Sequence, residues 1–219
     1  MTDETHTFLF ADLAGFTALT EVHGDEQAAD LAGEFFAAVR ELLASHGAEE
    51  VKTIGDAMLL RVNDPKEAIA LGRQIIDEIG GRPGFPVVRI GMNTGPAAER
   101  DGDWFGATVN LAARVSAAAH GDQVLITEAT EQACGKLDGI ELHRHGVERF
   151  KNVAEPVALF SAVRTGDRSE GRPIDPVCRM AVEPGDEAGT LTHGGTEYHF
   201  CSLDCVRAFA AEPDRYTPG

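Results

Sequence analysis

Hydrophobic positions alternate between strand-like and helix-like spacing through the first three quarters of this 219-residue chain. Residues 7–13 and 50–54 read as strands, and the amphipathic stretch 26–45 between them has the period of a helix. The chain therefore begins with a predicted strand, helix and strand.

The alternation continues after residue 54. Asp64 precedes a proline and a helical pattern, which makes it the expected N-cap of a helix over residues 65–79. A Gly/Pro-rich loop follows that helix, and a Gly/Asp-rich loop precedes the next one. The pattern predicts strands at 57–62, 87–94, 123–127, 140–150 and 156–163, and helices at 107–119 and 128–134.

Residues 165–173 have no apolar period, which is typical of an exposed linker. The segment after them has about 45 residues, a size at which an independent core usually needs a staple such as a bound metal. We therefore expect a larger domain over residues 1–164, a linker over 165–173 and a small domain over 174–219.

Composition narrows the function. The hydrophobic fraction of 43% is that of a globular protein. The chain carries 19 Lys and Arg against 36 Asp and Glu, and its formal net charge of -17 repels phosphate backbones and anionic lipid. We expect neither nucleic acid nor membrane as a partner. The apolar stretch 7–13 is too short to span a bilayer, and Asp3, Glu4 and Asp12 do not suit a secretory signal, which indicates a cytoplasmic protein.

Two carboxylates lie at strand ends. Asp12 stands where a strand gives way to a helical pattern, and Asp56 follows Gly55 at the expected tip of a hairpin. Singly, each is explained by capping or turn chemistry. Together they offer hard oxygen ligands for Mg2+ or Mn2+, while backbone N–H groups after Asp12 can bind the accompanying phosphate.

A third feature is a polar stripe on an apolar helix. Asn110 and Arg114 are four residues apart and share a face of the helix over 107–119. Such a pair is either satisfied within the protein or directed at a ligand. Neither of the two commonest glycine-rich phosphate-binding motifs occurs in the sequence.

Residues 10–17 (FADLAGFT), 52–56 (KTIGD) and 102–114 (GDWFGATVNLAAR) resemble the catalytic domain of class III nucleotide cyclases, and the resemblance spans roughly residues 7–164. It implies an α+β, ferredoxin-like fold with a βαββαβ core. It also implies a head-to-tail homodimer in which the two active sites lie between subunits.

The resemblance assigns roles position by position. Asp12 and Asp56 match the metal-binding aspartates, and the substrate-binding turn is Leu13, Ala14, Gly15 and Phe16. Lys52 and Asp103 match the pair that reads the adenine edge, while Asn110 and Arg114 match the pair that positions the ribose and stabilises the transition state. An ammonium donor and a carboxylate acceptor complement adenine, so the resemblance implies ATP as substrate with two Mg2+ or Mn2+ ions per site.

Three of the four cysteines lie in the last 42 residues: Cys178, Cys201 and Cys205. Thiolates at this spacing suit Zn2+ or Cu+, with His199 or His193 as the fourth ligand, and Cys201 and Cys205 share a face if a helix runs through them to Ala211. The alternative is that the three are small buried thiols. Cys134 stands apart and is interpreted as a buried thiol.

Residues 175–180 (DPVCRM), 198–205 (YHFCSLDC) and 209–216 resemble the YHS domain and related heavy-metal-associated modules. Arg179 stands where that family usually carries glycine. The resemblance implies a small α+β, metal-sensing or metal-handling accessory unit.

The combined hypothesis is an adenylate cyclase with a C-terminal metal-binding module. Three alternatives stay open: a catalytically weak nucleotide-sensing dimer, a guanylate cyclase, and a metal-handling protein with a vestigial cyclase domain.

Overall fold

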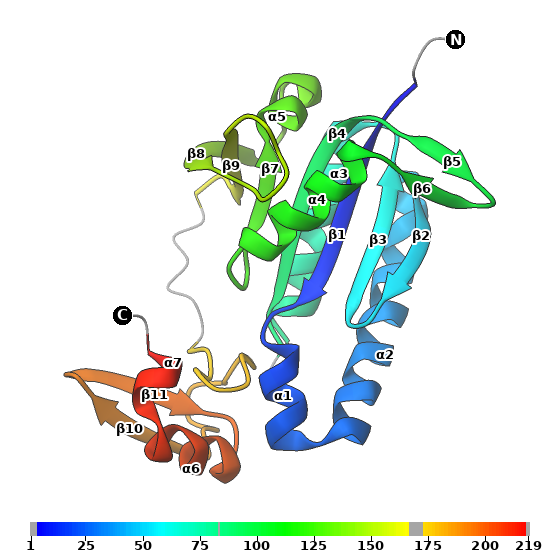
Figure 1. Ribbon diagram of the computed structural model, residues 1–219. Coiled ribbons are helices and arrows are strands. Elements are labelled where there is room, and N and C mark those ends of the chain that lie inside the picture. The colour runs from blue at the N-terminus through cyan, green and yellow to red at the C-terminus, as the bar shows by residue number, and fades with distance from the viewer. Residues whose placement is uncertain (1–3, 83, 167–172, 218–219) are drawn as a thin grey trace.

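A computed structural model describes residues 4–82, 84–166 and 173–217. A central sheet has the strand order β2-β3-β1-β4-β7-β9-β8, in which only β4 and β7 run parallel (Figure 1). Its strands are β1 (Thr5–Leu13), β2 (Ala48–Ile54), β3 (Ala57–Val62), β4 (Val88–Pro96), β7 (Val124–Thr127), β8 (Ile140–Glu148) and β9 (Val157–Arg164).

The first four strands form the ferredoxin-like core expected from the sequence. Helix α2 (Asp25–Leu43) connects β1 to β2, and helix α3 (Pro65–Ile75) connects β3 to β4. The resulting order β4-β1-β3-β2 is the split βαβ arrangement. Strands β7, β9 and β8 extend this sheet on the β4 side.

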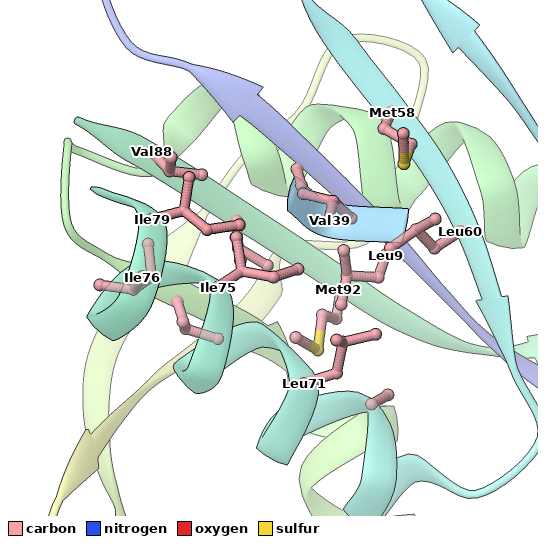
Figure 2. Close-up of a cluster of buried hydrophobic side chains, with 14 of the residues drawn as sticks. Leu9, Val39, Met58, Leu60, Leu71, Ile75, Ile76, Ile79, Val88 and Met92 are labelled. Atoms are coloured by element: carbon pink, nitrogen blue, oxygen red, sulfur yellow. The ribbon is translucent and has the colours of Figure 1, made fainter. Parts of the chain in front are cut away.

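The main hydrophobic core lies between the sheet and helices α2 and α3. Leu9 of β1 and Met92 of β4 meet Val39 of α2 and Ile75 of α3, and all four side chains are fully buried (Figure 2). The alternation along β1 directs Leu9, Ala11 and Leu13 to this face.

Helix α4 (Ala107–Ala118) covers the opposite face of the sheet (Figure 1). Phe8 and Phe10 of β1 pack there against Val109 and Ala112. At Gly91 the helix comes so close that a Cβ atom on that residue would lie 1.9 Å from the backbone nitrogen of Ser116. Glycine in β4 therefore sets the depth at which α4, with its polar stripe, lies on the sheet.

Some elements differ from the expectation. A short hairpin, β5 (Ala98–Arg100) and β6 (Asp103–Phe105), occupies the expected Gly/Asp-rich loop. A separate helix α1 (Phe16–His23) precedes α2, and the helix expected over 65–79 continues from Ile75 as a π-helical turn, Ile76–Gly80.

Other elements match the expectation. Asp64 caps α3 by accepting a hydrogen bond from the backbone nitrogen of Lys66, as predicted. Helix α5 (Glu128–Cys134) matches its predicted bounds.

The C-terminal segment contains β10 (Gly189–His193), β11 (Thr196–Phe200), α6 (Leu203–Ala211) and α7 (Pro213–Tyr216), and it packs against α1 (Figure 1). Leu19 of α1 and Ala28 of α2 are buried in one apolar cluster with Val177, Phe200 and Phe209. The small unit thus shares its core with the larger one.

Backbone hydrogen bonds join the two units as well. Val87 donates to the carbonyl of Arg179 at 3.0 Å, and Ala181 donates to the carbonyl of Phe85 at 3.0 Å. Of the linker expected over 165–173, residues 167–172 lie outside the described part of the chain.

Among the described residues, no helix combines the length and the apolar character needed to cross a membrane.

Candidate functional site

The structure brings Asp12 and Asp56 together at one end of the sheet. Asp12 lies near the end of β1 opposite Ala57, the first residue of β3, and Asp56 belongs to the β2–β3 turn. The pKa of the Asp56 carboxyl is raised to about 6, first by burial and then by charge repulsion and hydrogen bonding with the nearby Asp12 carboxylate. Two carboxylates this close suit a shared divalent cation, which would favour the ionised form of both.

Arg89 of β4 is a site residue that the sequence reasoning missed. Its Nε and a terminal nitrogen contact Oδ2 of Asp12 at 2.6 and 2.5 Å. The available signal was a single arginine in the otherwise apolar run Val87–Met92. Arg89 holds the Asp12 carboxylate by these contacts and lowers the net negative charge around it.

The turn after Asp12 supports only part of the expected phosphate cradle. The N–H group of Ala14 donates to the carbonyl of Val87 at 2.8 Å, so it is not available to a phosphate in this conformation. Leu13 and Ala14 are buried, and Gly15 adopts φ 77° as the N-cap of α1. The first N–H groups of α1, beginning at Phe16, have no partner within their own helix and remain the donors of this turn.

Lys52 and Asp103 form an ion pair between β2 and β6. The Lys52 Nζ atom lies 2.5 Å from Oδ2 of Asp103, and the hydrogen bond from Lys52 holds the pKa of the Asp103 carboxyl below its ordinary value. Asp103 Oδ1 accepts from the backbone nitrogen of Trp104 at 2.8 Å. The Lys52 ammonium also lies 5.8 Å from the ring centroid of Phe105, half of whose surface is exposed.

Asn110 and Arg114 face two adjacent pockets. Asn110 lines a pocket of about 580 Å³ together with Lys52 and Trp104, and with Arg114 and Asn152 it lines another of about 470 Å³. Within the described residues, neither Asn110 nor Arg114 makes a side-chain hydrogen bond or ion pair. Of the two interpretations open for this stripe, the geometry favours polar groups directed at a ligand.

Asp12 and the polar stripe of α4 lie on the same side of the sheet. Asp12 follows Phe10 by two residues in β1, so both side chains point to the face that α4 covers. Phe10 itself lines the larger pocket beside Lys52.

A second cluster gathers the three C-terminal cysteines around a histidine of the larger unit. The Sγ atom of Cys178 lies 3.3 Å from that of Cys201, which lies 3.9 Å from Sγ of Cys205. Nε2 of His23 lies 3.8 Å from the sulfurs of Cys201 and Cys205. These four ligand atoms all lie within 4.8 Å of one another.

His199 and His193, the expected fourth ligands, are directed elsewhere. The two ring nitrogens of His199 lie 3.6 Å from carboxylate oxygens of Glu187 and Glu197, and Nε2 of His193 lies 3.3 Å from Asp214. His23 takes the place expected for His199 because the C-terminal unit packs on α1. That packing joins residues distant in sequence and leaves no local sequence signal.

Cys201 and Cys205 do not lie on one helix, contrary to the expectation from their spacing in the sequence. Cys201 precedes the N-cap Ser202, so only Cys205 belongs to α6. Hydrogen bonds from Cys178 and then Cys201 lower the pKa of the Cys205 thiol, which makes it the preferred thiolate of the three. Cys134 is a free, buried thiol, as predicted.

Asp175 connects the loops that carry the cysteines. Its fully buried carboxylate accepts hydrogen bonds from the backbone nitrogens of Val177 at 2.8 Å and Cys178 at 3.4 Å on Oδ1, and from that of Cys201 at 2.8 Å on Oδ2. Burial nevertheless raises the pKa of Asp175 above its ordinary value.

Two family models match this chain, one in each of its two units. Residues 2–156 match the family model described as the adenylate and guanylate cyclase catalytic domain, and residues 174–219 match that of the YHS domain. A pH-sensitive adenylate cyclase of Mycobacterium tuberculosis is 36% identical over 167 residues, 73% of this chain and 42% of that protein. An adenylate cyclase of Streptomyces griseus is 32% identical over 193 residues, 84% of this chain and 46% of that protein.

This chain therefore spans less than half the length of these two curated relatives. Among solved structures, the adenylyl cyclase CyaB from P. aeruginosa superposes with a TM-score of 0.64 at 23% identity, covering 76% of this chain and 97% of the other. That likeness supports the fold.

Proposed function

Because this chain belongs to the adenylate and guanylate cyclase catalytic domain family, which its residues 2–156 match, we propose that it is an adenylate cyclase. In this reaction the ribose 3'-oxygen of ATP attacks the α-phosphorus, the bond to the leaving pyrophosphate breaks, and 3',5'-cyclic AMP forms. The observation that carries the proposal is the Lys52–Asp103 ion pair near Asn110, whose side chain has no hydrogen-bond partner in the part of the chain that the structure describes.

The ion pair supports adenine as the base. Adenine presents an N1 acceptor and an N6 amino donor, which match the Lys52 ammonium and the Asp103 carboxylate, whereas guanine presents the opposite polarity at these positions. Lys52 lines the larger pocket, and its pairing with Asp103 holds the two groups together before substrate arrives. The site is therefore preorganised for an adenine edge.

Asp12 and Asp56 would hold the divalent cations. Their oxygen donors fit Mg2+ or Mn2+, and two such ions would bind the triphosphate and promote loss of the 3'-hydroxyl proton. Arg89 keeps the Asp12 carboxylate in place, and a bound cation would favour the ionised form of Asp56, whose pKa is raised to about 6 without it. The N–H groups at the start of α1 lie next to Asp12 and would donate to phosphate oxygens.

Asn110 and Arg114 would act on the reacting part of the nucleotide. The amide of Asn110 can orient the ribose, and the guanidinium of Arg114 can bind the α-phosphate as its charge grows in the transition state. Because neither side chain has a partner among the described residues, neither must break an internal hydrogen bond to do so.

We propose further that the active form is a head-to-tail homodimer. Ile54 and Phe105, 49% and 51% exposed, border the larger pocket, where a second chain would cover them. In that arrangement the carboxylates of one protomer complete the site formed by the Lys52 and Arg114 faces of its partner.

The direct test is turnover by the purified chain with ATP and with GTP, each with Mg2+ and with Mn2+. We expect cyclic AMP from ATP, loss of product in Asp12→Ala and in Arg114→Ala, and near-normal rates in Arg207→Ala, which changes an exposed arginine of α6. Binding of ATP without turnover under all four conditions, or a preference for GTP, would contradict the proposal.

Mixing the two inactive variants tests the shared site. A mixed dimer of Asp12→Ala and Arg114→Ala chains carries both changes in one site and neither in the other. Random exchange at equal amounts should therefore restore about one quarter of wild-type activity. If both residues served one site within a single protomer, mixing would restore nothing.

A further inference from the structure

The cysteine–histidine cluster draws its groups from two units of the chain. Cys178, Cys201 and Cys205 belong to the YHS-like segment, whereas His23 is the last residue of α1 in the cyclase domain. We propose that His23 is the fourth ligand of a Zn2+ site whose other ligands are these three cysteines, and that the metal ties the two units together. The inference does not depend on the proposed catalytic activity.

The distances fit one tetrahedral ion. With Zn–S bonds of about 2.3 Å and a Zn–N bond of about 2.0 Å, a tetrahedral site has S–S edges of about 3.8 Å and S–N edges of about 3.5 Å. The observed edge between Cys201 and Cys205 is 3.9 Å, and both edges from His23 Nε2 are 3.8 Å. The edge between Cys178 and Cys201 is 3.3 Å, and the other two edges from Cys178 are at most 4.8 Å, so Cys178 is the ligand that must move most when the ion binds.

The donor set selects the metal. Three sulfurs and one imidazole nitrogen form a closed site of the kind that holds structural zinc. The cluster contains no carboxylate oxygen, which disfavours Mg2+ and Mn2+ and separates it chemically from the Asp12–Asp56 pair. Cys178 and Cys205 are completely buried, so an ion bound there is shielded from competing water.

Hydrogen bonds outside the cluster hold the cysteine loops in place. Asp175 accepts from the backbones of Cys178 and Cys201, and Ser202 accepts from the backbone nitrogen of Cys205 at 3.2 Å. Cys205 also lies in the first turn of α6, where the helix dipole favours a thiolate. Because the loops are already ordered, little conformational entropy is lost when the metal binds.

Contacts between α1 and the C-terminal unit hold His23 in place as well. Leu19 anchors α1 in the apolar cluster shared with the C-terminal unit, and Glu21 pairs with Arg215 of α7 at 3.2 Å. His23 follows in the last turn of the same helix. Since α1 begins directly after the turn that follows Asp12, ligation by His23 fixes the far end of the helix that leaves the candidate active site.

The first test measures metal binding by the full-length, reduced chain without nucleotide. We expect one Zn2+ per chain, and His23→Ala should weaken binding by about 100-fold or more because one of four ligands is lost. His23→Cys should restore tight binding. With Co2+ as a spectroscopic probe, the visible spectrum should change from that of a three-sulfur, one-nitrogen site to that of a four-sulfur site.

Matched controls keep this test decisive if a variant folds poorly. His199→Ala and His193→Ala remove histidines of the same module and should leave zinc affinity and the Co2+ spectrum unchanged. The proposal is overturned if the reduced wild-type chain binds no Zn2+, if His23→Ala binds it like wild type, or if His199→Ala shows the loss instead.

The second test measures the mechanical link by hydrogen exchange. Zinc should slow amide exchange in residues 16–23 of the wild-type chain by about tenfold or more, because the ion stabilises the docked form of α1. In His23→Ala, zinc at saturating concentration should slow exchange around Cys201 and Cys205 but not in α1. Unchanged exchange in α1 of the wild type would show that the ion does not connect the units.

Discussion

The carboxylate of Asp175 accepts a hydrogen bond from the backbone nitrogen of Cys201 at 2.8 Å, across 26 residues of chain. Its other oxygen accepts from Val177 and Cys178. One buried acid thus joins the loop of the first cysteine to the loop of the second.

Asp175→Asn should disrupt this connection. The amide of asparagine has only one acceptor oxygen. Its NH2 group would therefore face a backbone N–H group, and the hydrogen bond to one of the two loops would be lost. We expect a loss of about 2–3 kcal/mol in the free energy of unfolding, measured by urea denaturation. Asp186→Asn, at an exposed aspartate of the same module, should change it little; equal effects of both variants would refute the role assigned to Asp175.

Asp103→Ala tests base recognition. Removing the carboxylate takes away the acceptor for the adenine amino group and frees Lys52. We expect kcat/KM for ATP to fall by about tenfold or more while that for GTP changes less, so the ATP preference narrows. Asp138→Ala breaks a similar but exposed ion pair with Lys66 and should leave both values unchanged. A uniform loss with both nucleotides would contradict base reading by Asp103.

Much of the fold could be predicted because its elements have strong hydrophobic periods. Strand β1 alternates between two buried faces, and α3 begins at an Asp-Pro capping signal. The β5–β6 hairpin was missed because every residue of β5 is exposed, and the pairing gives no apolar pattern. The break between α1 and α2 depends on Gly24 with φ 87°, which reads in the sequence as an ordinary loop or helix glycine.

Some residues of the candidate sites could be found from the sequence and others could not. Asp12, Lys52 and Asn110 lie in motifs whose local order is informative, and their proposed roles stay predictions for the assays above. His23 could not be found from sequence, because its place beside Cys205 results from the packing of a separate unit on α1. His199 adjoins Cys201 in sequence, yet the strand β11 directs it to Glu187.

Glu50→Gln gives a pH-dependent test of the contact between α2 and β2. Arg40 donates to both carboxylate oxygens of Glu50, at 2.6 and 2.8 Å, and these hydrogen bonds lower the pKa of Glu50 below 4.5. The stabilisation is therefore complete above about pH 4.5 and is lost as the pH falls through the lowered folded-state pKa.

At pH 7 we expect Glu50→Gln to reduce the free energy of unfolding by about 0.5–1 kcal/mol, since the pair is partly exposed. Denaturation curves at decreasing pH should show this difference shrinking toward zero. Glu34→Gln, on the exposed side of α2, serves as the control; a difference that persists or grows in acid would exclude the ion pair as its source.

Gly15→Ala probes the contact between the turn after Asp12 and the C-terminal unit. Gly15 has φ 77°, and a Cβ atom there would lie 2.4 Å from Cγ of Arg179. We expect Gly15→Ala to cost about 2–4 kcal/mol, of which about 1 is backbone strain and the rest is the clash. Gly47→Ala should show the strain alone, because Gly47 has φ 56° with nothing within 4 Å of the added atom.

A double-mutant cycle with Arg179→Gly isolates the clash. Arg179 has φ 62°, so glycine fits its backbone, and the change removes both side-chain atoms nearest to the new methyl group. In that background Gly15→Ala should cost only about 1 kcal/mol, which gives a coupling of about 1–3 kcal/mol in unfolding measurements. Additive costs would mean that the side chain of Arg179 does not press on this turn in solution.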